Sequence, residues 1–476
     1  MSHPARRLIT CMLGLIAALA LPVGSAAAAP ASLTEAQAQQ VGTDAYVYGV
    51  SLMEFLRQRQ QQTSVTVPNA LSDAPIDQLG NARALATPAH QVFVAPNLDT
   101  LYSMGHVDLS NGPLVLHVPA VSGGRYYSFE FLDPYTNVFH YVGTRTTGNG
   151  AGNYVIVGPT FHGKLPAGLH RISSKYAHIW LVGRTQVYGP ADLPAVHKVQ
   201  NGYRLLPLTK FETAGLSYAP PRPHRIITTH TVATLPTGMA YFDALGTALA
   251  HNPAPARDAK ILAELKTAGI GPGLHPSTEN LPAATLAGLQ AAANGGGLAQ
   301  VFADRISIVF ASARAHHGWY VAPKDIGNFG TDFSLRAVIA VYGIAANLPV
   351  EAMYPVAAAD GTGALLGGAD KYVIHFAAGH LPPAKYFWSL TMYNAQNYLV
   401  ANSINRYALG NHSAGLKYNA DGSLDIYIQS TPPAGHQSNW LPCPPSGQIV
   451  PIMRMYGPKA PALNDTYSYP SITKVG

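Results

Sequence analysis

Charged side chains are scarce in this 476-residue chain, where Lys, Arg, Asp and Glu make up 11% of the residues. The usual share in soluble proteins is about 25%. No run of Lys or Arg remains that could follow a nucleic-acid backbone, so nucleic acid is not an expected partner. Disorder is not expected either, because 47% of the residues are hydrophobic. At this length, two or three domains are expected.

Cysteine is nearly absent, with Cys11 and Cys443 the two in the chain. Cys11 lies at the start of an apolar run over residues 9–23, which follows two arginines and precedes a stretch of small residues. This pattern is typical of a secretory signal peptide, and the run is too short to favour a membrane span. We therefore expect a signal peptide at 1–28 and a periplasmic or secreted mature chain without a transmembrane span. Such a chain has Cys443 alone and no internal disulfide, and a buried thiol is favoured over a catalytic one.

One passage occurs twice, at residues 114–131 and 372–392. Each copy is an apolar strand with histidine at its fourth position, a Gly/Pro turn, and an aromatic-aromatic-Ser-apolar-polar-apolar strand. His117 and His375 occur in both copies, so a shared architectural role is favoured over catalysis. Side chains alternate across a strand, so each second strand should present one core-facing set: Tyr127, Phe129 and Phe131 in the first copy, and Trp388, Leu390 and Met392 in the second.

The periodicity divides the chain into segments of different structure. Residues 33–62 have helical spacing, and Ala/Leu-rich helical patterns occupy much of 235–312. Short apolar segments bounded by turn residues indicate strands: 114–118, 126–131, 154–157, 179–182, 372–376, 386–393, 424–429 and 449–456.

We expect a mainly β (α+β) fold made of two β-sandwich or jelly-roll-like domains related by internal duplication. An N-terminal helix should precede the first domain, and a helical insert should separate the two. The expected limits are 29–234 for the N-terminal β domain with its leading helix, 235–325 for the helical connector and 326–476 for the C-terminal β domain.

Five motifs carry a family resemblance. The runs PNLDTLYS (96–103) and RYYSFEFLDPYTN (125–137) resemble the bacterial domain of unknown function 1254 (DUF1254). The runs FWSLTMY (387–393), NSINRY (402–407) and SNWLP (438–442) resemble its usual companion, domain of unknown function 1214 (DUF1214). The matches span most of the mature chain. The resemblance implies paired β-sandwich or jelly-roll-like domains with helical connections, and it implies no established activity.

Carboxylates are few, so their positions are informative. In the doubled passage Glu130 corresponds to the uncharged Thr391, and Asp133 corresponds to Asn394. A carboxylate on the second face of a strand must be solvated, paired or functional. Asp99 lies in a loop, where it either forms an Asx turn or acts as a general acid or base. We take Asp99, Glu130 and Asp133 as candidate catalytic residues, with Arg125 as the expected partner of Glu130 and Asp133.

The candidate substrate-binding residues are polar and aromatic side chains in the same motifs. Arg406 either clamps an anionic group or ties a loop to the sheet, and the loop role is favoured. The full set comprises Asn97, Tyr102, Arg125, Tyr135 and His140 in the first half, and Arg336, Tyr393, Arg406 and Trp440 in the second.

Familiar catalytic signatures are absent. The chain has no Gly-x-Ser-x-Gly elbow, no Walker loop and no His-Glu-x-x-His motif. Its nineteen histidines include no pair at strand i,i+2 or helix i,i+4 spacing, so no metal site is expected, and the sequence does not identify a cofactor.

Two classes of function remain. One is an exported hydrolase- or lyase-like enzyme that acts on a carbohydrate, ester or envelope-derived substrate through a carboxylate-containing pocket. The other is a non-catalytic protein that binds a carbohydrate or lipid or takes part in envelope assembly. A homo-oligomer is compatible with either class, because stacked jelly rolls readily associate.

Overall fold

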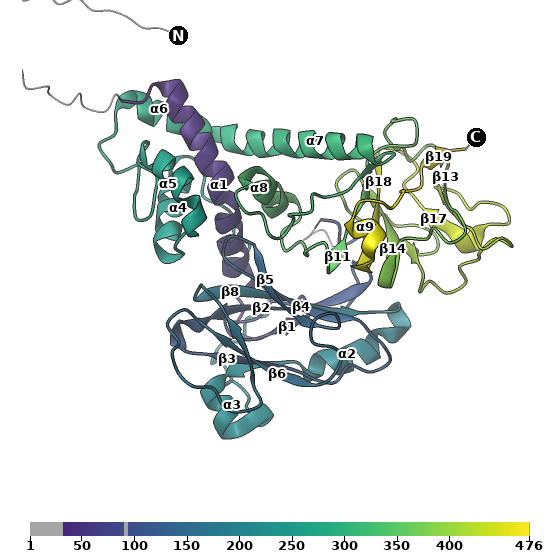
Figure 1. The fold of residues 1–476 in the computed structure, drawn as a ribbon, viewed down its shortest axis with the longest axis horizontal. Helices are drawn as coiled ribbons and strands as arrows, with labels where there is room; N and C mark the ends of the chain where they lie inside the picture. The colour runs from purple at the N-terminus through teal and green to yellow at the C-terminus, as the bar shows by residue number, and fades with distance from the viewer. Residues whose placement is uncertain (1–31, 90–93, 476) are drawn as a thin grey trace, which may run out of the picture.

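The computed structural model describes residues 32–89 and 94–475. The expected signal peptide lies outside these residues. Figure 1 shows two β-rich parts and a group of helices that lies beside them. The fold is mixed α+β, with four antiparallel or mixed sheets in the described part of the chain, an N-terminal helix and a helical middle region.

The first half contains two sheets that share one core. A five-stranded sheet has the order β1-β2-β8-β4-β5, and a four-stranded sheet has the order β7-β6-β3-β9. Apolar side chains from both sheets, such as Phe129, Leu116 and Ile156, pack in one cluster between them. The elements are β1 (Gly80–Asn81), β2 (Thr100–Asp108), β3 (Leu114–Val118), β4 (Tyr127–Leu132), β5 (Val138–Gly143), β6 (Gly152–Val157), β7 (His170–Ser173), β8 (His178–Gln186), α2 (Leu193–Gly202), β9 (Arg204–Pro207) and α3 (Leu208–Ala214).

The second half has the same kind of arrangement. Its larger sheet has the order β10-β12-β18-β14-β15, with β11 also paired to β18, and its smaller sheet has the order β17-β16-β13-β19. Trp388, Leu390 and Ile426 belong to the core between these sheets. The elements are β10 (Trp319–Tyr320), β11 (Ala352–Met353), β12 (Val356–Ala357), β13 (Tyr372–Phe376), β14 (Ala384–Asn394), β15 (Ala408–Gly410), β16 (Leu424–Gln429), β17 (Trp440–Pro442), β18 (Ile449–Pro458), α9 (Ala460–Leu463) and β19 (Ile472–Lys474).

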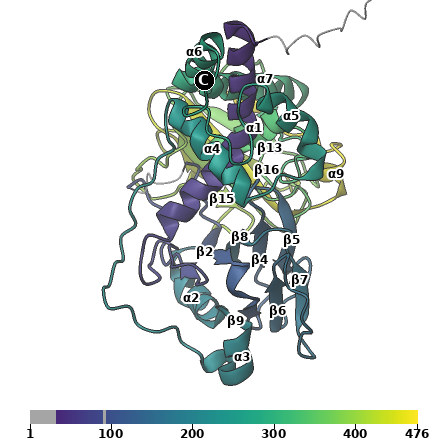
Figure 2. The ribbon, with the colours of Figure 1, turned by 90° about the vertical axis from the view of Figure 1, so that its left-hand side faces the viewer.

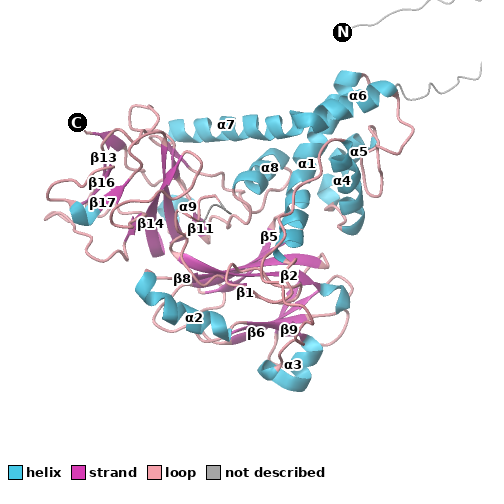
Figure 3. Ribbon diagram, turned by 180° about the vertical axis from the view of Figure 1, so that it is seen from behind, coloured by secondary structure: helices cyan, strands magenta, loops and turns pink. Residues whose placement is uncertain are grey.

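The helices surround α1 (Glu35–Gln62), whose first turn is closed by a capping box between Thr34 and Gln37. α1 packs against α4 (Met239–His251), α6 (Ala283–Ala291), α7 (Gly297–Ala315) and α8 (Phe333–Tyr342). The remaining helix of this group is α5 (Ala259–Lys266). Figure 2 shows these helices above the first half, and Figure 3 shows α7 running from them toward the second half. β10 falls within the expected helical connector, yet it pairs with β12 of the second half.

Both copies of the doubled passage fold as expected from the sequence. β3 and β13 lie in the four-stranded sheets, whereas β4 and β14 lie in the larger ones. The expected core-facing side chains of β4 and β14 are in the two cores. His117 Nδ1 lies 2.7 Å from Oδ1 of its cross-strand neighbour Asn153, and His375 Nδ1 lies 2.7 Å from Oδ1 of its neighbour Asp425. These matching contacts agree with an architectural role for both histidines.

Candidate functional site

The second faces of β4 and β14 are buried as well, because the larger sheets of the two halves meet there. The Tyr126 ring of the first half contacts Phe387 and Tyr456 of the second, at centroid distances of 5.8 and 5.2 Å. The Tyr126 hydroxyl donates to Glu351 Oε1 at 2.7 Å, and Arg145 pairs with the other oxygen of Glu351. Aromatic contacts and charged hydrogen bonds therefore fix the two halves against each other.

Residues 95–99, here called the crossing loop, lead into β2 and bind directly to the second half. Asn97 makes the Asx turn of this loop by accepting the Asp99 amide at 2.7 Å. The Asp99 carbonyl accepts the Val187 amide at 2.9 Å, which continues the β2–β8 pairing. The bonds to the second half are Ala95 N–H to Asn397 O, Arg454 Nη2 to Ala95 O, Tyr393 Oη to Pro96 O, Asn97 Nδ2 to Tyr456 Oη, and Ser389 Oγ to Asp99 Oδ2.

Asp99 is held from both halves. Its backbone belongs to the first half, whereas its carboxylate accepts the Ser389 hydroxyl of β14 at 2.6 Å. Burial raises the pKa of Asp99 above the usual range, opposed by the positive charge of Arg454, the Ser389 hydrogen bond and nearby His412. A buried carboxyl group whose pKa is raised in this way is suited to take and give protons.

A cavity of about 940 Å³ opens beside this carboxylate, between the two halves. We call it the Asp99 cavity. Tyr188 and Gln186 line it from the first half, and Phe387, Tyr407 and His412 line it from the second. Among its described lining residues, Asp99 is the one carboxylate and Arg406 is the one arginine. This size is typical of small-molecule sites.

Two arginines that were not predicted from the sequence lie at matching positions in the two larger sheets, Arg184 on β8 and Arg454 on β18. Arg184 is opposite Ser128 in the β4–β8 pair, and Arg454 is opposite Ser389 in the β14–β18 pair. Arg184 Nη1 donates to Glu130 Oε2 at 2.6 Å, and Arg454 Nη1 donates to Thr391 Oγ1 at 2.8 Å. The sequence signal was clearest at Arg454, which lies between two methionines in β18, whereas Arg184 lies between Gly183 and Thr185 in β8.

Glu130 is paired rather than free in a pocket. It has no exposed surface, and burial raises its pKa while the Arg184 charge lowers it. Arg125, the partner expected from the sequence, instead forms a bidentate ion pair with Asp192, with N–O distances of 2.6 and 2.8 Å. That expectation was wrong because Arg184, distant in sequence, reaches Glu130 from the neighbouring strand. Glu130 is not among the described residues that line the Asp99 cavity.

Asp133 closes a turn at the end of β4. Its Oδ1 accepts the amides of Tyr135 and Asn137, both at 2.9 Å. Asn394 does the same at the end of β14, accepting the amides of Gln396 and Tyr398 at 3.0 and 2.9 Å. The turn therefore needs an acceptor oxygen and not a charge.

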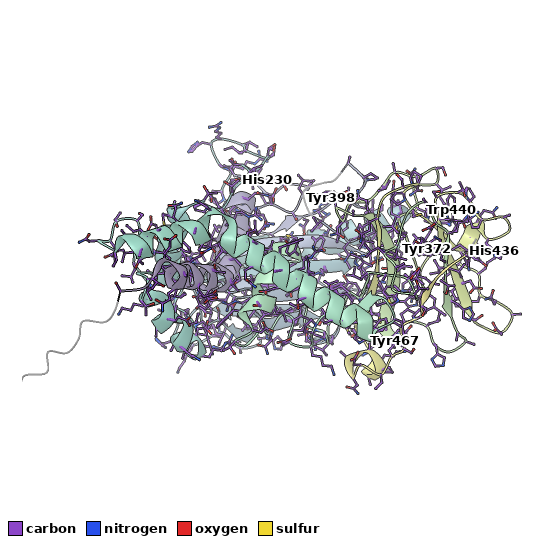
Figure 4. The ribbon with its side chains drawn as sticks, turned by 90° about the horizontal axis from the view of Figure 1, so that it is seen from above. His230, Tyr372, Tyr398, His436, Trp440 and Tyr467 are labelled. Atoms are coloured by element: carbon purple, nitrogen blue, oxygen red, sulfur yellow. The ribbon has the colours of Figure 1, made fainter. Side chains whose placement is uncertain are left out.

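The other candidate residues lie apart from the Asp99 cavity. Tyr135 and Arg336 are buried near α1, where Tyr135 donates to Asn252 O and Arg336 donates to Tyr48 O, both at 2.8 Å. His140 packs edge-on against Phe131, and burial lowers its pKa. Trp440 donates to Gln429 O at 2.8 Å, and Figure 4 shows it within the second half, well apart from His230.

The remaining candidates line a cavity or secure its wall. Arg406 lines the Asp99 cavity but donates to the carbonyls of Gln437 and Trp440, which is the loop-tying role favoured from the sequence. Tyr393 secures the crossing loop. Asn97 and Tyr102 line a second cavity of about 410 Å³ on the other side of that loop.

Neither a metal site nor a reactive thiol is evident in the described part of the chain. No group of three or more His, Cys, Asp or Glu side chains there is arranged to hold a metal ion. Burial raises the pKa of Cys443 to about 12, which keeps the thiol protonated. The described helices include none that is long and apolar enough to cross a membrane.

Fold and site together define a two-part α+β protein with a cavity between its halves that Asp99 lines. Residues 76–207 match the family described as "Protein of unknown function (DUF1254)", and residues 351–460 match "Protein of unknown function (DUF1214)". The chain thus carries an N-terminal DUF1254 domain and a C-terminal DUF1214 domain. A search of the curated proteins finds no significant match.

Two solved structures match this chain over most of its length. The VPA0106 protein from Vibrio parahaemolyticus is 20% identical, with a TM-score of 0.66 over 92% of this chain and 100% of that one. At this identity the likeness shows a shared fold alone. An uncharacterized protein from Burkholderia cenocepacia is 12% identical, with a TM-score of 0.43 over 92% of this chain and 94% of that one.

Proposed function

We propose that this chain is an exported hydrolase- or lyase-like enzyme and that Asp99 is its acid–base group. The observation that carries the proposal is the position of Asp99: a carboxylate with a raised pKa in a cavity of about 940 Å³ between the two halves. Perturbed carboxyl groups in concave pockets are typical of catalytic sites.

The neighbours of Asp99 fit this role. Ser389 fixes one carboxylate oxygen, while the Arg454 charge favours the ionised form. In a hydrolysis, the Asp99 carboxylate removes a proton from water as the water attacks the substrate, and the protonated carboxyl then returns that proton to the leaving oxygen. In an elimination, the same carboxylate removes a proton from carbon, a C=C bond forms as the adjacent C–O bond breaks, and the protonated carboxyl then gives that proton to the leaving oxygen.

The lining narrows the substrate class. Cleavage of a glycosidic bond by the usual route needs two carboxyl groups roughly 5–10 Å apart. The described lining of the Asp99 cavity holds one, and Glu130 and Asp133 are engaged elsewhere. This favours an ester or an acidic polysaccharide cleaved by elimination over a neutral glycoside.

The alternative is a non-catalytic protein that binds a carbohydrate or a lipid. Tyr188, Phe387 and Tyr407 give the Asp99 cavity aromatic surfaces on which a sugar ring or acyl chain can pack. In that case Asp99 contributes hydrogen bonds to a ligand, and no turnover occurs. A role in envelope assembly or in a homo-oligomer belongs to the same class.

We also infer that the halves are β-sandwich domains related by duplication. The strand orders correspond one to one, β1-β2-β8-β4-β5 with β10-β12-β18-β14-β15 and β7-β6-β3-β9 with β17-β16-β13-β19. The turns after β4 and β14 also agree, since Thr136 and Asn397 adopt positive φ values of 62° and 60°. Export remains inferred from the basic and apolar start of the sequence.

The test compares Asp99→Asn with Asp133→Asn in mature protein taken from the periplasm, whose N-terminus we expect at Ala29. Wild type is assayed on p-nitrophenyl esters, p-nitrophenyl glycosides and uronate polysaccharides, with ultraviolet absorbance to detect eliminated products. On any substrate that wild type converts, Asp99→Asn should lower kcat by roughly 100-fold or more, as loss of an acid–base group does. Asp133→Asn should retain most activity.

Near-normal turnover by folded Asp99→Asn would remove Asp99 from the mechanism. If wild type and Asp99→Asn both bind a sugar or lipid saturably and neither converts it, the result would favour a non-catalytic binding protein.

A further inference from the structure

The second cavity lies on the opposite side of the crossing loop from Asp99. Residues 95–97 line this cavity, whereas residues 98 and 99 line the Asp99 cavity. Its floor is the outer face of the β2–β8 pair, where Tyr102 is opposite Arg184 and Met104 is opposite Val182. Gln58 of α1 and residues 340–345 at the end of α8 also line it. The floor, one helix and one helix end thus form a preformed enclosure of about 410 Å³.

Every charged side chain in the described lining of this cavity already has an ion-pair or hydrogen-bond partner, and the two carboxylates, Glu54 and Asp73, balance the two arginines, Arg57 and Arg184. Glu54 and Arg57 of α1 are 2.8 Å apart, and Asp73 Oδ2 is 2.8 Å from His230 Nδ1, its hydrogen-bond partner. Arg184 is held by buried Glu130 at 2.6 Å. The cavity therefore offers little net charge to a ligand, and an ionised ligand would lose hydration without gaining an opposite charge.

Three buried polar atoms of the lining have no hydrogen-bond partner: Trp180 Nε1, Arg184 Nε and Gln58 Oε1. Their residues are 2%, 4% and 4% exposed. Buried donors and acceptors are nearly always satisfied in folded proteins. Two unused N–H donors and one unused acceptor around one enclosure indicate a ligand with complementary groups.

The two donors define the shape of that ligand. Trp180 and Arg184 are four residues apart on β8, so both face the cavity and their Cα atoms are about 13 Å apart. Trp180 is held by stacking on His106, with ring centroids 5.1 Å apart. Val182 and Met104 supply apolar surface between the donors. A long, mostly apolar molecule fits this floor better than a compact polar one.

We propose that this cavity is a second binding site, specific for an uncharged, elongated and mainly apolar small molecule with a carbonyl oxygen. The carbonyl accepts the free N–H of Trp180, and the apolar body lies along β8. This site is independent of the proposed acid–base chemistry, because none of its three unpartnered groups lines the Asp99 cavity.

The test is a fluorescence titration of the full mature chain with 6-propionyl-2-(dimethylamino)naphthalene, an uncharged, elongated ketone whose emission shifts to the blue in an apolar site. One saturable site per chain is expected. Trp180→Phe keeps an aromatic ring and removes the indole N–H, so it should weaken binding by about five- to tenfold. Ala84→Trp adds bulk at an exposed position of the lining and should abolish binding.

Ala414→Trp is the matched control, because Ala414 is exposed and lines the Asp99 cavity alone. It should leave the titration unchanged, and the anionic probe 8-anilinonaphthalene-1-sulfonate should not displace the ketone. No saturable binding by wild type, equal affinity in Ala84→Trp, or displacement by the anionic probe would each overturn the proposal. Because the experiment measures binding, its result does not depend on whether Asp99 catalyses a reaction.

Discussion

At the scale of single residues, comparing the two copies of the doubled passage identified the strands that meet between the halves, but it selected Glu130 and not Asp99 as the distinctive carboxylate. It singled out Glu130 against Thr391. Both residues bond to an arginine, Arg184 and Arg454 respectively. Thr391 carries no charge, and the carboxylate whose charge acts on Arg454 is Asp99 of the first half. A comparison of aligned positions cannot find a group that one half supplies to the other.

The role of Asp133 in its turn can be tested through the pH dependence of the free energy of unfolding. Burial raises its pKa to about 6, against about 3.9 in an unfolded chain. Between these values the folded state keeps the proton and the unfolded state loses it, so this group's contribution to stability falls as pH rises from about 4 to about 6. Asp133→Asn keeps the acceptor oxygen and removes the titration. Its free energy of unfolding relative to wild type should be higher at pH 7 than at pH 4, by on the order of 1–3 kcal/mol.

Urea unfolding at both pH values measures this difference. Asp421→Asn is the control, because hydrogen bonds from Ser423 lower the pKa of exposed Asp421 and its effect should have the opposite sign. A stability difference for Asp133→Asn that does not change with pH would contradict the assigned environment.

At the scale of elements, the sequence predicted the long and periodic segments well. The expected helix at 33–62 is α1 at Glu35–Gln62, and the expected strand at 372–376 is β13. Two-residue strands such as β1 and β10 had no signal, because so short a segment has no periodicity and exists only through its partner strand. The packing of α1 against α4 to α8, which begin 204 to 298 residues after α1 begins, also had no local signal.

The α1–α6 contact depends on a close approach at Gly288. A Cβ placed there would meet Glu35 O and, at 2.6 Å, Gln39 N, and backbone atoms cannot turn aside as a side chain can. Gly288→Ala should therefore destabilise the fold by about 1–3 kcal/mol, despite the roughly 0.5–1 kcal/mol that alanine contributes within a helix.

Urea unfolding followed by circular dichroism measures this effect against Gly150→Ala, since nothing lies within 4 Å of a Cβ at Gly150. Gly150→Ala should be nearly neutral. Equal stability of the two variants would show that α6 can move away from α1 without cost.

At the scale of the whole molecule, the site exists because the two halves meet. The sequence predicted two β-rich halves with helices between them, and the described residues agree with that order. It could not predict which faces meet, since both faces of β4 and β14 are largely apolar or neutral in sequence. The crossing loop fixes which faces meet, because it joins the halves through five hydrogen bonds and holds Asp99 at the Asp99 cavity.

The central claim is that the second half tunes an acid–base group of the first. The most direct measurement is the pH dependence of kcat/KM for Ser389→Ala beside Ser128→Ala, on a substrate that wild type converts. The Ser389 hydrogen bond lowers the pKa of Asp99, so its loss should move the apparent pKa of the profile upward. Ser128 has the matching position on β4 and no hydrogen bond to Asp99, so its loss should leave the profile in place. A profile that stays fixed in Ser389→Ala, or that shifts equally in both variants, would contradict the account.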